Sequence, residues 1–234
     1  MSKLHTVLRR LLGQKPPASA FMDHLAQVLN AARVAVVFDV GANRGPYARA
    51  LFAAGFTGRV VSFEPEAESH AELGARARGH GRWRVAPPMA LGAAAGEGAL
   101  NVFNRTDMSS LTPLVDAGFT AFPKLESAGT QTVTVRTFDE ICGDYAGADE
   151  RAFLKIDTQG HEGQVLAGAS ARLPWLAGVQ LEIALTPLYQ GQASYLELFT
   201  LMARQGFAPV LFSPGFFNKR LGRQIDFDAV FLRA

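Results

Sequence analysis

Along most of the chain, short apolar runs alternate with stretches in which apolar residues recur every three or four positions. Short apolar runs are typical of buried strands, and the longer periodic stretches are typical of the helices that cover them. Because consecutive parallel strands need a crossover connection, this order predicts a parallel sheet with helices on both faces. The strands predicted in the first part of the chain are 34–39, 60–64 and 83–86, and the helices are 46–54 and 67–78.

The same alternation returns after residue 150 and changes only at the end of the chain. Strands are predicted at 152–157 and 179–185, and helices at 162–169 and 195–205. The last two strands, 207–212 and 226–232, have no helix between them and must be antiparallel neighbours. We therefore expect a Rossmann-like α/β fold with a seven-stranded, mostly parallel sheet whose last strand is antiparallel. This layout resembles the class I methyltransferase fold rather than a dehydrogenase.

The middle of the chain departs from this pattern. Two alternating segments, 98–104 and 131–135, are typical of strands, and the stretch between them has no long periodic run. Loops of this length in a compact domain are usually functional. We interpret 104–131 as a loop insertion that lies over the C-terminal edge of the sheet on the substrate side. No linker interrupts the chain, so 34–234 is predicted to form one methyltransferase-type domain.

The first 33 residues are predicted to form a helical extension. Within 3–13, five leucines and valines recur at helical spacing, and the basic residues lie elsewhere on the helix. Two interpretations fit this short basic helix: it rests on a membrane surface or a partner, or it docks on the main domain. A second helix is predicted from about Phe21 to Asn30, capped by Ser19 or a residue near it.

Composition and charge narrow the class of protein. The chain has 234 residues, 48% of them hydrophobic and 19% charged, which is ordinary for a globular protein. A net charge of +2 without a long basic run gives no case for a nucleic-acid partner. The single cysteine, Cys142, allows no intrachain disulfide and is expected to be a small core residue. Because no apolar run is long enough to span a bilayer and no secretory signal is present, we expect a cytoplasmic protein. Nothing in the sequence indicates an oligomeric state.

The first strand leads into a turn that suggests a bound cofactor. Asp39 ends the strand, and Gly41 and Gly45 bracket the turn that follows. Asn43 stands where a dinucleotide-binding turn has its middle glycine, so a side chain obstructs close approach of a pyrophosphate. Asp39 would also repel a pyrophosphate but suits a cationic amine or sulfonium. Glu64 ends the second strand 19 residues after Gly45, the position of an acid that holds a ribose.

S-adenosylmethionine has an amine, a sulfonium and a ribose, so this turn predicts S-adenosylmethionine as the cofactor. The alternative is that the two glycines only make a tight strand–helix turn in a fold without a ligand.

Beyond the turn, several segments closely resemble the FkbM family of S-adenosylmethionine-dependent methyltransferases. The most specific match is the run Lys155-Ile156-Asp157-Thr158-Gln159-Gly160-His161-Glu162. Further matching segments are 38–45, 62–65, 90–92 with 96–97, 109–111, 165–169, 181–182 and 187–191. The resemblance implies O-methylation of a hydroxyl, commonly on a sugar of a glycan, a glycolipid or a glycosylated natural product. The cofactor-binding residues expected from the turn and the resemblance are Asp39, Gly41, Ala42, Asn43, Gly45, Glu64, Pro65, Ala90, Leu91 and Asp157.

Methyl transfer to a sugar hydroxyl needs a positioned base, because the hydroxyl is a weak nucleophile. Asp157 ends its strand at the same sheet edge as Asp39, and His161 follows at the start of the next helix. Our hypothesis is that His161 is the general base and that Asp157 orients it or the substrate. The alternative is that Asp157 caps the helix and that His161 is a polar first-turn residue. Glu182, near the end of the next strand, is expected to face the pocket and position the substrate.

Three alternatives remain open at this point. Asp157, His161 and Glu182 together could ligate a divalent metal, although no tight ligand spacing supports such a site. A nicotinamide-dependent oxidoreductase could use a similar sheet, but the sequence lacks the middle glycine and a Tyr-x-x-x-Lys pair. A non-catalytic binding module could have the same fold. The presence of Asp39, Glu64, Asp157 and His161 argues against this alternative.

Overall fold

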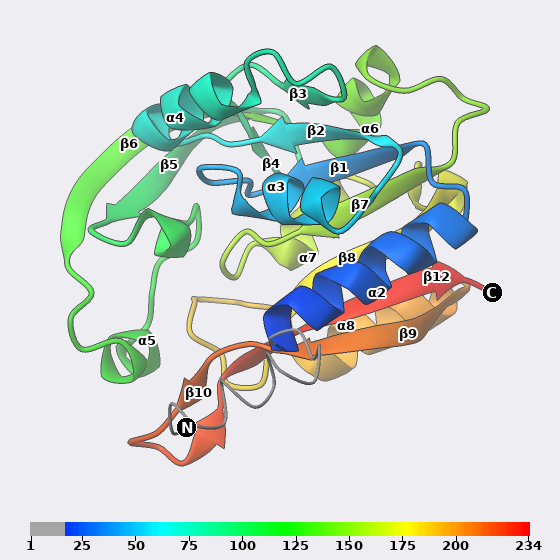
Figure 1. Cartoon of the computed structure of the whole chain (residues 1–234). Helices are drawn as coiled ribbons and strands as arrows, with labels where there is room; N and C mark the ends of the chain where they lie inside the picture. Colours follow the sequence, from blue (N-terminus) through cyan, green and yellow to red (C-terminus); the bar gives the residue numbers. More distant parts are fainter. Residues whose placement is uncertain (1–16) are drawn as a thin grey trace, which may run out of the picture.

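A seven-stranded sheet forms the centre of the computed structural model, which describes residues 17–234 (Figure 1). The strand order is β3-β2-β1-β7-β8-β12-β9. The strands are β1 (Val36–Val40), β2 (Arg59–Phe63), β3 (Trp83–Val85), β7 (Ala152–Ile156), β8 (Leu176–Ala184), β9 (Phe207–Pro214) and β12 (Asp226–Arg233). The five adjacent strands β3, β2, β1, β7 and β8 run parallel to one another. Strand β12 is antiparallel to both of its neighbours, β8 and β9. The predicted fold class, including the antiparallel last strand, is confirmed.

Helices cover both faces of this sheet and bury a separate apolar core on each. On one face lie α2 (Pro17–Ala31), α3 (Pro46–Ala53) and α4 (Ala67–Ala77), and on the other lie α6 (Phe138–Ile141), α7 (Glu162–Ala167) and α8 (Tyr195–Arg204). Successive side chains of β1 point to opposite faces of the sheet. Val37 therefore packs in the core under α2, α3 and α4, whereas Val36 and Phe38 pack in the core under α6, α7 and α8. Strands buried on both faces explain the continuous apolar runs in the sequence.

The excursion in the middle of the chain forms a small second sheet of order β4-β6-β5. Its strands are β4 (Ala90–Leu91), β5 (Gly96–Phe103) and β6 (Ser127–Arg136), and between β5 and β6 the chain makes η1 (Thr106–Met108) and α5 (Asp116–Ala121). Figure 1 shows this sheet and α5 extending away from the main sheet. The remaining short elements are η2 (Cys142–Asp144), η3 (Leu173–Trp175) and a hairpin of β10 (Phe217–Asn218) and β11 (Arg223–Gln224).

Some predicted boundaries need correction. The helix expected to be capped at Ser19 already begins at Pro17, because proline is compatible with the first helical turn. The sequence pattern also missed α5, whose six residues are too few to show a helical period. The helix predicted over 3–13 lies outside the described residues. Among residues 17–234, no helix is long and apolar enough to cross a bilayer.

A row of polar side chains crosses the face of the sheet that carries α2 and α3. Strand register places Ser62, Asp39, Lys155 and Gln180 side by side on four neighbouring strands. The Ser62 hydroxyl donates to Asp39 Oδ2 at 3.1 Å, and the Lys155 ammonium lies 3.0 Å from Asp39 Oδ1. Gln180 then donates to Asp228 Oδ1 at 3.1 Å. Burial alone would lower the pKa of Lys155, but the negative charges of Asp39 and Asp157 raise this pKa by more, so the ammonium stays charged.

Replacing Lys155 with methionine tests the buried ion pair, because methionine keeps the volume and leaves Asp39 charged without its partner. We expect the K155M variant to lose about 3–5 kcal/mol of unfolding free energy in urea denaturation. The control is Arg136→Gln, which breaks the exposed Arg136–Glu140 pair and should cost at most about 1 kcal/mol. Equal losses in the two variants would show that the buried pair is not a structural constraint.

Candidate active site

The turn between β1 and α3 is packed against the end of β7. Gly41 has φ +74°, and a Cβ placed there would lie 1.8 Å from the carbonyl oxygen of Asp157. Only glycine tolerates this close approach of two backbones. Asn43 adopts φ +47°, and its side chain donates to Thr106 Oγ1 at 3.1 Å. The turn is therefore fixed between the main sheet and the 104–131 segment.

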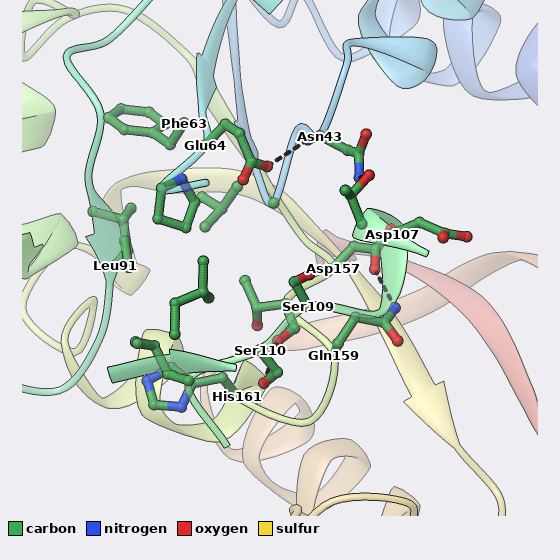
Figure 2. A pocket seen from close by; sticks show the side chains of 18 of the residues that line it. Asn43, Phe63, Glu64, Leu91, Asp107, Ser109, Ser110, Asp157, Gln159 and His161 are labelled. Atoms are coloured by element: carbon green, nitrogen blue, oxygen red, sulfur yellow. Dashed lines mark hydrogen bonds between the residues drawn. The ribbon is translucent and has the colours of Figure 1, made fainter. Parts of the chain in front are cut away.

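Glu64 faces the turn from the end of β2 (Figure 2). One carboxylate oxygen accepts the backbone N–H of Asn43 at 2.7 Å, and the other accepts that of Glu66 at 2.8 Å. A carboxylate has about four acceptor sites, so each oxygen keeps one for a ligand. Burial raises the pKa of Glu64 to about 7, an effect that the two backbone hydrogen bonds partly offset.

These residues line a cavity of about 610 Å³, which we call the turn cavity. Figure 2 shows Phe63 and Leu91 on one side of it and Asp107, Asp157 and Gln159 on the other. Its lining, which combines apolar side chains with a few polar groups, is typical of a small-molecule site. The expected cofactor residues that line it are Gly41, Asn43, Glu64, Pro65, Ala90, Leu91 and Asp157.

Three expected cofactor residues do not line the turn cavity. Asp39 is fully buried and paired with Lys155, so its carboxylate supports the turn from beneath and does not face a ligand. Gly45 is buried, and a Cβ there would lie 2.6 Å from the Trp83 ring. Ala42 lines a different cavity on the α2 side of the sheet. The spacing argument placed the turn correctly but could not tell which of its side chains point outward.

A second cavity, of about 710 Å³, lies next to the first and contains three acids, Asp107, Glu182 and Asp226. We call it the acidic cavity. Asp107 and Gln159 line both cavities and so mark the boundary between them. Burial raises the pKa of Glu182 well above its usual range, and the nearby charges of Asp157 and Asp226 raise it further.

Gln159 bridges the two carboxylates at this boundary. Its side-chain amide nitrogen donates to Asp157 Oδ1 at 3.0 Å and to Glu182 Oε2 at 2.6 Å. Two acceptors facing one amide require the nitrogen on that side, because a carbonyl oxygen there would repel both. The hydroxyl of Tyr189 lies 3.1 Å from the amide oxygen of Gln159 and 3.0 Å from the carbonyl oxygen of Met108, so its one hydrogen is shared between these two acceptors.

The loop that carries Gln159 is held by a buried acid and a glycine. Glu162 Oε1 accepts hydrogen bonds from the backbone N–H groups of Thr158 and Gly160 and from the hydroxyl of Thr158. Gly160 has φ +89°, and a Cβ there would lie 2.4 Å from Cβ of Tyr189. Gln159 itself adopts φ +56°, which is uncommon for a residue other than glycine. The sequence signal for Gln159 was its place inside the most specific motif, but its role depends on the three-dimensional arrangement.

His161 lies apart from the acids. Its Nδ1 is 3.0 Å from Thr112 Oγ1, and a Cβ on Gly92 would lie 3.2 Å from its Nε2. The hydrogen-bond partner of Asp157 is Gln159, and its ion-pair partner is Lys155. The structure thus brings Asp157 and Glu182 together through Gln159 but does not pair Asp157 with His161. Burial lowers the pKa of His161, which favours the neutral ring.

The metal alternative finds no support in this geometry. Among residues 17–234, no three His, Cys, Asp or Glu side chains are grouped so that they could hold a metal ion. Asp157, His161 and Glu182 therefore do not form the ligand set considered from the sequence.

With this geometry established, comparison with known proteins defines the family. A model of the methyltransferase FkbM domain matches residues 39–209, which include the turn, Glu64 and the whole β7–α7 loop. The chain belongs to the FkbM methyltransferase family. No curated protein is similar enough in sequence to count as a relative.

Solved structures share the fold of this FkbM domain at low sequence identity. An rRNA methylase from Streptococcus thermophilus is 14% identical, with 94% of this chain and 97% of that chain covered and a TM-score of 0.50. The magnesium protoporphyrin IX methyltransferase from Synechocystis PCC 6803, solved with bound SAH, is 11% identical, with 100% and 95% covered and a TM-score of 0.50. At these identities the likeness shows a common methyltransferase fold.

The Gln159 bridge can be tested by changing its amide to a carboxylate. In the Q159E variant the new carboxyl group lies beside those of Asp157 and Glu182. Repulsion between the three negative charges raises its pKa in the folded state above its pKa in the unfolded state. Stability is then lost as the pH rises, and we expect a deficit of about 1–3 kcal/mol at pH 8 that shrinks towards pH 5. Urea denaturation at both pH values measures it.

The matched control is Gln159→Met, which removes both donors without adding a charge and should show a smaller change with pH. The same pH trend in the two variants would contradict the assignment of Gln159 as the group that holds the two carboxylates.

Proposed function

We propose that this FkbM domain transfers a methyl group from S-adenosylmethionine to a hydroxyl of a sugar in a glycan, a glycolipid or a glycosylated natural product. The turn cavity would hold the cofactor and the acidic cavity would hold the acceptor. The observation that carries the proposal is the orientation of Glu64, whose carboxylate is anchored by two backbone N–H groups and faces the turn cavity.

The lining of the turn cavity fits the parts of S-adenosylmethionine. Glu64 retains one acceptor site on each oxygen, which suits the two neighbouring hydroxyls of a ribose. Beside it, Phe63, Met89 and Leu91 offer an apolar wall for a purine ring. At the other side, Asp157 presents a carboxylate, with 34% of its side chain exposed, to the cationic end of the cofactor.

The same lining argues against a nicotinamide dinucleotide. The side chain of Asn43 is held in place by its bonds to Thr106 and to the backbone N–H of Arg44. It therefore occupies the position where a dinucleotide-binding turn needs a glycine for the pyrophosphate. Asp107 and Asp157 add negative charge to the same side of the cavity, which opposes a pyrophosphate further.

In the proposed reaction S-adenosylmethionine supplies an activated methyl group, and the chain must align the acceptor hydroxyl with it and remove a proton. Asp157 and Glu182 lie at the boundary of the two cavities, where that hydroxyl would have to approach. The raised pKa of Glu182 makes its carboxylate a stronger base than an ordinary glutamate. We assign Glu182 as the proton acceptor, Asp157 as a group that positions the hydroxyl, and His161 as part of the wall of the turn cavity.

The acidic cavity has features of a carbohydrate site. Carboxylates such as Glu182 and Asp226 accept hydrogen bonds from sugar hydroxyls, and the ring of Phe216 offers an apolar face to sugar C–H groups. Among the described residues that line it, the one cation is Arg105, which is already paired with Asp107. The excess of acids in the described lining disfavours an acceptor whose reacting sugar is itself anionic.

Cofactor binding is tested by replacing Glu64 with glutamine. We expect the wild-type chain to bind S-adenosylhomocysteine in isothermal titration calorimetry and the E64Q variant to bind it about 10- to 100-fold more weakly, because a charge-assisted acceptor is lost. The control is Glu68→Gln, an exposed acid on α4 whose side chain is 73% exposed. Tighter binding of NADH than of S-adenosylhomocysteine would refute the cofactor assignment.

The base assignment is tested with labelled S-adenosylmethionine and a panel of nucleotide sugars, glycolipids and neutral oligosaccharides. With the acceptor that becomes methylated, we expect Glu182→Gln to lower kcat by about 10²- to 10⁴-fold. His161→Ala should change KM for the cofactor and leave kcat within about threefold. The opposite pattern, with turnover lost in H161A and kept in E182Q, would return the base role to His161. No labelled product from any acceptor would count against a hydroxyl-sugar substrate.

A further inference from the structure

Charge is unevenly distributed along this chain. Two stretches, 1–22 and 213–225, contain no Asp or Glu and carry four and three Lys or Arg residues, respectively. The remaining residues hold 16 Lys or Arg against 21 Asp or Glu. A chain with a net charge of +2 thus divides into two cationic stretches and an acidic remainder, which suggests an anionic partner for the cationic part.

The second cationic stretch forms an exposed hairpin with an apolar tip. Phe217 and Leu221 are 51% and 42% exposed, and Lys219, Arg220 and Arg223 surround them in the sequence and are exposed as well. Figure 1 shows this hairpin, marked by β10, protruding from one end of the molecule. Two large apolar side chains at an exposed tip cost free energy in water and are typical of a contact surface.

A buried asparagine holds the tip in this shape. Asn218 Nδ2 donates to the carbonyl of Ala121 at 3.1 Å, and its Oδ1 accepts the backbone N–H groups of Arg220 and Leu221 at 3.0 Å each. The hairpin is therefore anchored to α5, with its apolar and basic side chains directed outward. Its exposure is built into the fold.

The neighbouring elements extend the same surface. The ring of Phe216 lies 4.9 Å from that of Phe122, next to α5, where Phe119 is 45% exposed and Lys124 is exposed. We call Phe119, Lys124, Phe216, Phe217, Lys219, Arg220, Leu221 and Arg223 the hairpin surface.

The start of α2 lies at the base of the hairpin. Phe21 and Met22 line a cavity together with Ser213 and Asp228, the strand residues that lead into and out of the hairpin.

We infer that the hairpin surface docks on an anionic lipid bilayer. Exposed phenylalanine and leucine side chains next to exposed cations on one hairpin match the two layers of a membrane interface, with anionic headgroups outside and acyl chains within. A second copy of this chain is disfavoured because two identical cationic surfaces repel each other.

Docking would also orient the acidic cavity. Phe216 belongs both to the lining of that cavity and to the hairpin surface, and its ring contacts Phe122 of the same lining, so the cavity lies close to the membrane when the hairpin is bound. This step rests on the proposed function and favours an acceptor sugar carried by a lipid. The docking itself does not depend on methyl transfer and is measured without cofactor.

The experiment is co-sedimentation of the full chain with vesicles of phosphatidylcholine alone and of phosphatidylcholine with about 30% phosphatidylglycerol. We expect binding to the anionic vesicles, weakened by salt, and little binding to the neutral ones. Removing three cations (K219Q/R220Q/R223Q) or the apolar tip (F217S/L221S) should each lower the partition coefficient by on the order of tenfold or more.

Matched controls change the same chemistry elsewhere. R49Q/R78Q/R204Q removes three exposed cations from other elements, and L196S removes an apolar side chain that is 62% exposed on α8. These variants should bind like the wild type, with circular dichroism checking that every variant folds. Equal losses in control and hairpin variants, binding to single-stranded RNA but not to vesicles, or a hairpin-dependent dimer in gel filtration would each overturn the inference. Retained S-adenosylhomocysteine binding in the hairpin variants separates this outcome from failure of the proposed function.

Discussion

The buried ion pair between Asp39 and Lys155 is the interaction on which the site depends. It joins the two central strands of the sheet one residue before each of them ends, and the turn and the β7–α7 loop begin just beyond it. A buried charge is strongly destabilising without its partner. A shift of β7 by one residue relative to β1 would move Asp39 and Lys155 to opposite faces of the sheet, so the pair opposes any change in register. The pair therefore fixes where Gly41 and Asp157 lie relative to each other.

That fixed register explains why the two loops can approach so closely. Lys155 also lies 3.2 Å from the carbonyl oxygen of Gly41 and 3.5 Å from Asp157 Oδ2, so one ammonium contacts both loops as well as Asp39. Above it, Gln159 extends the arrangement by holding Asp157 and Glu182 with a single amide. The Lys155 ammonium compensates the negative charge of the acids beneath the turn. The Gln159 amide lies between the two carboxyl groups at the boundary of the cavities. Each buried acid therefore has a polar partner.

The sequence predicted the sheet well because strands buried on both faces leave short, continuous apolar runs that alternate with helical periods. It also predicted that Glu64 and the turn come together at the strand ends, because that placement depends on local spacing. It could not show that Asp39 faces Lys155 and not a ligand, since both alternatives place an acid at the end of β1. Nor could it pair Gln159 with Glu182, because that contact joins separate strands and depends on the left-handed backbone at Gln159. α5 and the β10–β11 hairpin were missed because each is too short to show a period.

The positions that the sequence predicted least well lie outside the regular alternation of strands and helices. The turn cavity is built by strand ends, whose geometry the sheet dictates. The acidic cavity takes Met108 from η1, Tyr189 from the loop after β8 and Phe216 from the hairpin, three segments outside the regular alternation. Their positions are set by tertiary contacts such as the bond from the Tyr189 hydroxyl to the Met108 carbonyl, at 3.0 Å. An acceptor site assembled in this way can change with a few loop residues while the ion pair and the turn stay the same. In the proposed function, acceptor choice therefore depends on these segments, whereas the ion pair and the turn support the cofactor side of the site.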